Sequence, residues 1–314
     1  MAALWSSISG VLEVLIIILV GFGLAKRGWF DKKTSRLIAK LVTQVALPAA
    51  MISTITKNFT ADILLRTLPD LRFPILSMAI LFGLSIGVAR ILRIKKDERG
   101  LFESMFLNSN TIFIGLPINM ALFGVPSLPY VLVYYMANTT IFWTLGVYLI
   151  QRDGDQGNHL SAADVAKKVF SPPLLGFMLG VVLVLLHISL PAFLTKSLTD
   201  LGNMTVPLSM IFIGIAISRT KLSDIRFSRK IMGVLAGRFL VAPLLMAALV
   251  LPTGMPILMK QVFIMQAAMP VMTNAPVVSQ LYGADDRYAA VAVAETTSLS
   301  LIFVPILMFL VQHI

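Results

Sequence analysis

The sequence lacks cysteine altogether, and only 13% of its 314 residues are charged. Without cysteine the chain has no disulfide framework, no thiolate nucleophile and no cysteine metal site. The HExxH motif of zinc proteases and a glycine-rich phosphate loop are also missing, and the three histidines do not have metal-ligand spacing. We therefore expect no enzyme, no metal site and no cofactor.

The composition is that of a membrane protein. Apolar residues make up 57% of the chain and the mean hydropathy is +0.88, far from the values of a soluble domain. At roughly 20 residues per span, the length allows about ten spans and no separate soluble domain. We expect them at 4–25, 34–56, 73–92, 108–124, 128–150, 172–187, 197–218, 231–251, 259–282 and 288–311. No basic residue precedes the first span and no small-residue cleavage pattern follows it, so we expect it to be retained.

The net charge of +11 would suggest nucleic-acid binding in a soluble protein. Here, however, most of the 26 Lys and Arg residues fall in alternate loops between the expected spans. By the positive-inside rule these loops are cytoplasmic, which places both termini outside the cytoplasm. We therefore expect a multi-pass protein of the cell (plasma) membrane, with the lipid bilayer and not nucleic acid as its partner.

Residues 108–124 form an apolar segment with unusual polar content. Its polar and helix-breaking residues are Asn108, Ser109, Asn110, Thr111, Gly115, Pro117 and Asn119. Pro117 removes a backbone donor and Gly115 loosens the turn before it, so the segment is expected to be two half-helices. Broken helices persist at membrane depth only where protein buries them or where they line a cavity.

A second copy of this segment lies 159 residues later. The same interval of 69 residues separates Pro48 from Pro117 and Pro207 from Pro276. Other pairs at the 159-residue offset are Gly21 and Gly180, Met51 and Met210, Ile52 and Ile211, Leu122 and Leu281, and Gly124 and Gly283. We therefore predict a five-helix repeat at 1–150, a cytoplasmic linker at 151–171 and a second repeat at 172–314. Since five spans is an odd number, the repeats are inverted, and their matching interruptions point to a transporter's binding site.

Helix N-termini that face such a cavity favour an anion, for example a carboxylate. The expected substrate-binding residues are Asn110, Thr111, Pro117, Asn119, Thr273, Asn274 and Pro276. For the amides and hydroxyls the alternative is helix–helix hydrogen bonding, and for the prolines it is an ordinary kink. Weaker candidates for secondary contacts are Gln44, Asn138, Asn203 and Gln266.

Three charged residues, Glu13, Arg238 and Glu295, lie inside expected spans. A charge at the bilayer centre costs at least about 2.5 kcal/mol on insertion scales, so each needs a role. They either form interior ion pairs, carry protons or provide a counter-charge for substrate. Arg238 and Glu295 are expected at similar depth, which favours a structural pair between them.

The motifs resemble those of a known family. NTIFIGLP at 110–117, LFG at 122–124, QAAMP at 266–270 and the ten-span layout are similar to the auxin efflux carrier family, which includes the plant PIN auxin exporters and bacterial malate-permease-like proteins. The resemblance implies the fold of bile acid–sodium symporters, with a scaffold domain and a transport domain that contains two crossed, proline-broken helices. It also implies elevator-type alternation, a homodimer, and a substrate carboxylate held near Asn110 and Pro117, with Pro276 at the corresponding place in the second crossover.

The sequence therefore predicts an all-α integral membrane protein with ten helices, of which helices 4 and 9 are the broken crossover helices. Its expected function is secondary transport of a small organic anion, such as an auxin-like carboxylate or a dicarboxylate like malate. Two alternatives stay open. A sodium-coupled symporter of the bile acid type would need carboxylates and carbonyls around the crossing, where the sequence offers mainly amides and hydroxyls. A membrane receptor would use the same cavity without turnover, although an inverted repeat favours two conformations of equal energy that face opposite sides.

Overall fold

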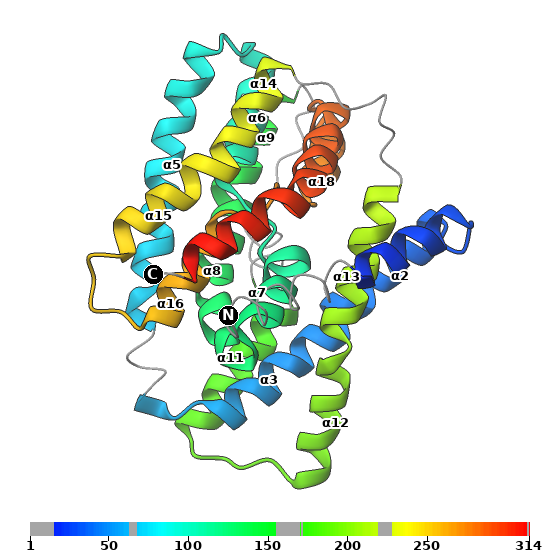
Figure 1. Cartoon of the computed structure of the whole chain (residues 1–314), viewed down its shortest axis with the longest axis vertical. Helices are drawn as coiled ribbons and strands as arrows, with labels where there is room; N and C mark the ends of the chain where they lie inside the picture. The colour runs from blue at the N-terminus through cyan, green and yellow to red at the C-terminus, as the bar shows by residue number, and fades with distance from the viewer. Residues whose placement is uncertain (1–15, 63–67, 155–169, 171, 219–227, 313) are drawn as a thin grey trace. The chain divides into compact units, whose positions relative to one another are not determined.

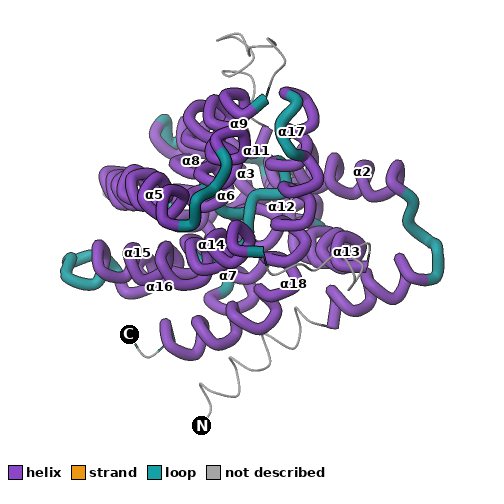
Figure 2. The backbone as a smooth tube through the Cα atoms, turned by 90° about the horizontal axis from the view of Figure 1, so that it is seen from above, coloured by secondary structure: helices purple, strands orange, loops and turns teal. Residues whose placement is uncertain are grey.

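The computed structural model describes residues 16–62, 68–154, 170, 172–218, 228–312 and 314, and nearly all of them are helical (Figures 1 and 2). Within these residues the only extended pairing is one isolated bridge. The first described helix is Ile16–Lys26. The others are α2 Lys32–Leu41, η1 Val42–Ala46, α3 Leu47–Asn58, η2 Leu68–Leu71, α5 Arg72–Ile91, η3 Lys96–Glu98, α6 Arg99–Leu107, η4 Thr111–Gly115, α7 Leu116–Phe123, η5 Val125–Ser127, α8 Leu128–Ile141, η6 Phe142–Gly146, α9 Val147–Asp153, α11 Pro172–Leu185, α12 Ala192–Asn203, α13 Thr205–Ser218, α14 Arg229–Ala236, η8 Gly237–Val241, α15 Ala242–Val250, α16 Ile257–Ala267, α17 Ala275–Tyr282 and α18 Asp286–Val311.

Four of the described helices are long and apolar enough to cross a membrane. They are Pro69–Ile91, Ala192–Ile215, Arg229–Val250 and Asp286–Val311. Shorter apolar helices cover Ile16–Lys26, Thr111–Phe123, Leu174–Leu185 and Ile257–Ala267. The chain is thus a helical protein with several membrane-spanning candidates, while the count of ten spans in two inverted repeats stays a prediction. Glu13 and much of the first expected span lie outside the described residues.

The chain divides into two compact units. Unit 1 contains Met1–Asp70, Ile112–Val133 and Val169–Arg219, and unit 2 contains Leu71–Thr111, Tyr134–Lys168 and Thr220–Ile314. Each unit therefore combines stretches from both expected repeats. The first broken segment is divided between the units, because residues up to Thr111 belong to unit 2 and Ile112 begins the next part of unit 1.

In unit 1, α3 packs against α11 and α12, and α7 packs against α13. Two of its glycines stand at close helix contacts. A Cβ on Gly21 would lie 2.7 Å from the Cα of Ile211, and a Cβ on Gly180 would lie 2.9 Å from the Cβ of Ile55 and 3.5 Å from the Cα of Ile52. Small residues allow helices in membranes to approach this closely. Since Gly21 and Gly180, like Ile52 and Ile211, are 159 positions apart, unit 1 contains the same kind of contact twice.

In unit 2, α5 packs against α6 and α15, α6 packs against α9, and α16 packs against α15 and α18. Figure 1 shows α5 in cyan beside the yellow α14 and α15. These helices hold the two places where the broken segments are interrupted, and α17 packs against α18 immediately after the second of them. Unit 2 is thus the part of the chain in which the predicted crossing is to be sought.

The two prolines of the broken segments do not occupy the interruptions. Pro117 is the second residue of α7, which spans 116–123, and Pro276 is the second residue of α17, which spans 275–282. The two helices therefore match at the 159-residue offset, and each ends at a glycine with positive φ, 70° at Gly124 and 77° at Gly283. In the first turn of α17 a missing N–H costs nothing, because that donor would have no intrahelical partner. The backbone leaves the helix several residues earlier in each segment.

Proline also accounts for most of the π-helical turns. The segments η1, η4 and η8 each end two residues before a proline, at Pro48, Pro117 and Pro243. Proline lacks the N–H that would bond the carbonyl four residues earlier, and its ring crowds that carbonyl. A wider turn before the proline relieves the crowding and lets an apolar helix continue.

Candidate functional site

The two interruptions pair with each other inside unit 2. The helix α6 ends at Leu107 and the chain is extended at Asn108, while α16 ends at Ala267 and the chain stays non-helical up to α17. Ser109 forms an antiparallel bridge with Val271, and the N–H of Asn110 donates to the carbonyl of Pro270 at 2.8 Å. Residues 108–111 and 268–274, which we call the paired breaks, therefore lie against each other although they are far apart in the sequence.

Side chains from two other helices complete the backbone pairing. Asn138 of α8 accepts the N–H of Ser109 through Oδ1 at 3.0 Å and donates Nδ2 to the carbonyl of the same residue at 2.8 Å. Thr296 of α18 accepts the N–H of Val271 through its hydroxyl at 3.2 Å. Both side chains act as a neighbouring strand would, because they satisfy backbone groups that lipid cannot.

Arg238 of η8 joins the ends of both broken helices. Its Nη1 donates to the carbonyls of Phe106 and Leu107 at 3.1 and 3.2 Å, which are the last residues of α6. Its Nε donates to the carbonyl of Met269 at 3.0 Å, and its Nη2 donates to the carbonyl of Ala267. The last carbonyls of a helix have no intrahelical donor, so one guanidinium, with 0% of the residue exposed, satisfies those of two helices.

This arrangement sets the charge of the paired breaks. Each helix C-terminus carries about half a negative charge and each N-terminus about half a positive charge. The guanidinium offsets the C-terminal ends of α6 and α16, so these do not repel an anion. The helix α17 begins directly after the second break, and its N-cap residue Asn274 makes no side-chain capping bond. Its first N–H groups consequently add positive character beside the breaks.

Five of the predicted substrate-binding residues lie in or next to the paired breaks. Asn110 and Thr111 are buried there, with 3% and 2% of their surface exposed. Thr273 and Asn274 are half-buried at the end of the second break, and Pro276 is half-buried in the first turn of α17. The sequence prediction thus placed these five residues in one neighbourhood, and their contact with substrate stays a prediction.

The other two predicted residues, Pro117 and Asn119, belong to unit 1. Both are buried. The amide of Asn119 donates to the carbonyl of Gly115 at 2.7 Å, one turn earlier in its own helix, and the hydroxyl of Ser127 donates to the carbonyl of Asn119 at 3.3 Å. These contacts are structural ones within unit 1.

The guanidinium of Arg238 bonds four backbone carbonyls. The expected pair between Arg238 and Glu295 stays a prediction. Glu295 is buried in α18, one residue before Thr296. Of the weaker candidates, Asn138 binds the first break and Gln266 donates its amide to the carbonyl of Thr111 at 3.3 Å. Gln44 and Asn203 are exposed.

Two polar atoms at or next to the paired breaks have no hydrogen-bond partner within the described part of the chain, Asn108 Oδ1 and Gln266 Oε1. A buried polar atom without a partner costs about 1–3 kcal/mol. Beside helix ends whose charge is offset, these atoms can accept hydrogen bonds from a polar ligand.

One sequence pattern in unit 2 imitates a hydrolase motif. Residues 83–87 read GLSIG, which has the GxSxG spacing of a serine nucleophile. In hydrolases that serine stands at a sharp turn between a strand and a helix. Here Ser85 is buried in the middle of α5, and its hydroxyl donates to the carbonyl of Phe82 at 2.7 Å. The motif is part of a spanning helix and does not form a nucleophile elbow.

Comparison with known proteins matches nearly the whole chain to membrane transporters. The family model described as membrane transport protein matches residues 6–308. An uncharacterized transporter of Methanocaldococcus jannaschii is 28% identical over 305 residues, which cover 94% of this chain and 95% of that protein. An uncharacterized transporter of Methanothermobacter thermautotrophicus is 26% identical over 308 residues, with the same coverage of 94% and 95%. A third uncharacterized transporter, from Saccharomyces cerevisiae, is 25% identical over 184 residues, or 49% of this chain and 41% of that protein.

Proposed function

Because the chain belongs to the membrane transport protein family, which is the auxin efflux carrier family expected from its motifs, it is a membrane transporter, and we propose that it carries small organic anions. The proposed substrate site is the pair of breaks in unit 2. The proposed substrates are an auxin-like carboxylate or a dicarboxylate such as malate.

The observation that carries this proposal is the position of Arg238. A midplane site built from two helix C-termini alone would repel an anion, whereas the guanidinium offsets both ends. Polar side chains that favour an anion, the amides of Asn110 and Asn274 and the hydroxyl of Thr111, stand on the same breaks. A carboxylate is bound well by such donors together with the N-terminus of α17.

The division into two units supports an elevator-type mechanism, in which a transport domain carries the site past a scaffold. Each unit combines segments of both halves of the chain, as expected if both repeats contribute to each domain. The recurring glycine contact of unit 1 supports the inverted repeat. Assembly as a homodimer, insertion in the plasma membrane and extracytoplasmic termini are parts of the same proposal.

The contacts of Arg238 also bear on the sodium-coupled alternative. Sodium sites in proteins are built from oxygen ligands, including backbone carbonyls. At the paired breaks and the helix ends beside them, four such carbonyls already accept hydrogen bonds from one guanidinium, and a cation beside Arg238 would be repelled. This favours transport without sodium at this position over a symporter of the bile acid type.

The test is uptake of labelled malate and labelled indole-3-acetate into proteoliposomes under imposed pH, sodium or voltage gradients. We expect saturable flux of one acid that does not need sodium and that Asn110→Ala abolishes. Asn203→Ala is the matched control, because that amide is exposed at the end of α12. Thermal unfolding of each variant in detergent establishes that it is folded.

Each result separates the alternatives. Flux that requires sodium supports the symporter, and binding of either acid without flux under any gradient supports the receptor. If the flux is unchanged in Asn110→Ala, the proposed site is wrong, although the protein is still a transporter.

A further inference from the structure

A polar pocket that contains none of the residues of the paired breaks lies in unit 2, at the end of α5. The pocket has a volume of about 430 Å³ and is lined by Ile86, Arg90, Lys96, Arg99, Glu103 and Arg152. The residues come from α5, η3, α6 and α9. Four basic groups and one carboxylate give it three net positive charges, which is unusual for a cavity in so apolar a chain.

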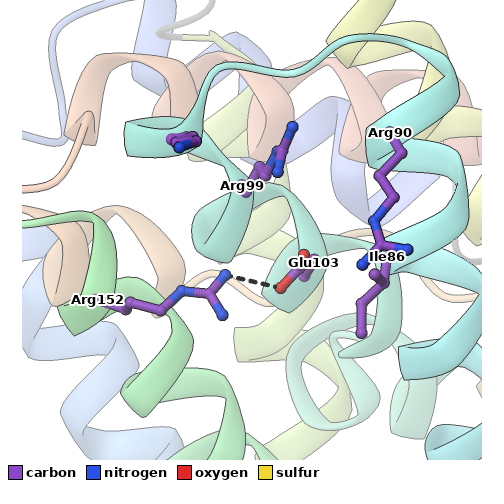
Figure 3. Close-up of a pocket in the computed structure, with 6 residues that line it drawn as sticks. Ile86, Arg90, Arg99, Glu103 and Arg152 are labelled. Carbon is purple, nitrogen blue, oxygen red and sulfur yellow. Dashed lines mark hydrogen bonds and ion pairs between the residues drawn. The ribbon is translucent and has the colours of Figure 1, made fainter.

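The single carboxylate does not neutralise the pocket. Glu103 is buried, and Arg152 Nη2 pairs with its Oε2 at 3.1 Å. Figure 3 shows Arg152 and Arg90 pointing toward Glu103 from opposite sides, with Arg99 nearby. The Nε of Arg99 donates to the carbonyl of Ile94 at 3.1 Å, which fixes the side chain and leaves its terminal nitrogens available. Glu103 thus holds one guanidinium in place and leaves the other cations uncompensated.

Two of the three acidic groups next to the pocket, Glu98 and Asp153, are bound elsewhere, and the third, Asp97, is exposed. Glu98 pairs with Lys230 at 2.9 Å. Asp153 accepts the N–H of Leu101 at 2.7 Å and so caps the first turn of α6. Burial raises the pKa of the Asp153 carboxyl. Arg90 and Lys96 make no ion pair among the described contacts.

The chemistry of these groups selects a phosphate. Arginine presents N–H donors in a planar fork that fits two oxygens of a phosphate at once, and lysine adds a compact positive charge. Arg90, Arg99 and Lys96 reach the pocket from three successive elements, so a tetrahedral anion between them can be held from several sides. A pocket of this volume accommodates a phosphate and the group esterified to it.

The position of the pocket selects a lipid as the source of that phosphate. Arg90 lies in the last turn of a spanning candidate, Pro69–Ile91, and only 28% of its apolar window is buried within the protein. Next to it on α5, Ile91 is 80% exposed and Leu84 is 43% exposed. An acyl chain has apolar surface to lie on directly beside the charged cavity. Basic pockets between spanning helices bind anionic lipid headgroups in this manner.

We propose that this pocket binds the phosphate of an anionic phospholipid headgroup, with Arg90, Lys96 and Arg99 as its cationic ligands and Arg152 held beside them by Glu103. The site is separate from the paired breaks and does not depend on which substrate they bind.

The test is a titration of fluorescently labelled phosphatidylglycerol, and separately of labelled phosphatidylcholine, into the full-length protein in neutral detergent. We expect wild-type protein to prefer phosphatidylglycerol. Two basic side chains near an anionic surface contribute enough that the double variant Arg90→Gln/Lys96→Gln should lose about 30-fold in affinity for it. Because both residues are exposed, the variant should unfold at the same temperature as wild type in phosphatidylcholine micelles.

The control is Arg27→Gln/Lys33→Gln, which removes the same charge from two exposed residues outside the pocket. Retained affinity in this control supports a defined site, and an equal loss there shows general attraction between charges and overturns the proposal. A third arm adds glycerol 3-phosphate as a competitor. Failure to displace the lipid at millimolar concentration supports a lipid source, whereas displacement as effective as that by unlabelled phosphatidylglycerol identifies a soluble phosphate site and overturns the lipid assignment.

Discussion

Replacement of Arg238 tests whether hydrogen bonds or charge alone hold the paired breaks together. Arg238→Met keeps a long apolar stem and removes every donor, so four buried carbonyls from two helix ends lose their partner. Each buried acceptor left without a partner costs about 1–3 kcal/mol, and removal of the buried cation offsets part of the total over four carbonyls, which leaves a net cost of about 3–5 kcal/mol. We expect the free energy of unfolding to fall by an amount in that range.

Arg238→Lys separates the two explanations. Lysine keeps the charge, yet its single ammonium has three donors on a shorter reach, whereas the guanidinium has five in a planar fork. One ammonium cannot donate to the carbonyls at the end of α6 and at the same time to both carbonyls of Ala267 and Met269. At about 1.5–3 kcal/mol for each hydrogen bond to a charged group, the loss of the one bond that three donors cannot make predicts a variant at least about 1.5–3 kcal/mol less stable than wild type.

The assay is denaturant unfolding in mixed micelles, followed by circular dichroism. Arg229→Lys and Arg229→Met serve as controls, since Arg229 is exposed at the start of α14. Uptake of the identified substrate should fall in the same order as stability, because the breaks and the site are the same structure. If Arg238→Lys is as stable and as active as wild type, charge compensation suffices and the shared hydrogen bonds have no special role.

Three further variants examine the packing and the coupling of unit 2. Gly237→Ala places a Cβ 2.4 Å from ring carbons of the buried Phe106, so overpacking should lower the free energy of unfolding by about 1–3 kcal/mol. Gly83→Ala, which has no atom within 4 Å of the added Cβ, should instead raise it by about 0.5–1 kcal/mol, and equal effects of the two variants would contradict the packing argument. Glu295→Gln removes a buried ionisable group of α18. It is adjacent in sequence to Thr296, whose hydroxyl binds the N–H of Val271 in the second break. If that group carries the coupling proton, uptake in proteoliposomes should stop responding to an imposed pH gradient while substrate binding persists, and an unchanged pH response would exclude the role.

The location of the breaks was predictable because side chains carry the signal. Polar residues at 108–111 interrupt an apolar segment, and the Pro117 and Gly124 that follow them recur 159 residues later as Pro276 and Gly283. The structure pairs these residues with the second interruption. The prolines misled the local prediction, since a proline marks where a helix is free to start as well as where it ends. Pro276 lies in the first turn of α17, and Pro117 follows a π-helical turn.

The carbonyl contacts of Arg238 were not predictable from the sequence. The residue itself was conspicuous, because an arginine within an apolar span is costly. In a sequence, the residue that can pair with an arginine is a carboxylate, which is why Glu295 was expected beside Arg238. The acceptors are backbone carbonyls, and these become available only where a helix ends in an apolar interior. Which ends meet depends on tertiary structure that one sequence does not show.

The contacts of the paired breaks also bear on how the site opens. The two breaks share a β-bridge, a backbone hydrogen bond and one guanidinium. Separating them would expose all of these groups to an apolar interior at about 1–3 kcal/mol for each unpaired group. In an elevator mechanism the breaks stay together and unit 2 moves as a body, whereas a mechanism that opens the site between the breaks has to break these contacts in every cycle.

A disulfide across the bridge distinguishes these mechanisms. Residues facing each other in an antiparallel bridge have Cα atoms roughly 4.5–5.5 Å apart, within the range that a disulfide spans. Since the chain contains no cysteine, Ser109→Cys/Val271→Cys introduces the only two thiols, and the reduced form is its own control for the substitutions. We expect oxidation to leave the uptake rate of the reduced double variant unchanged, because the breaks need not separate. If oxidation abolishes uptake and reduction restores it, the breaks part during transport, and the elevator mechanism with a rigid site is wrong for this protein.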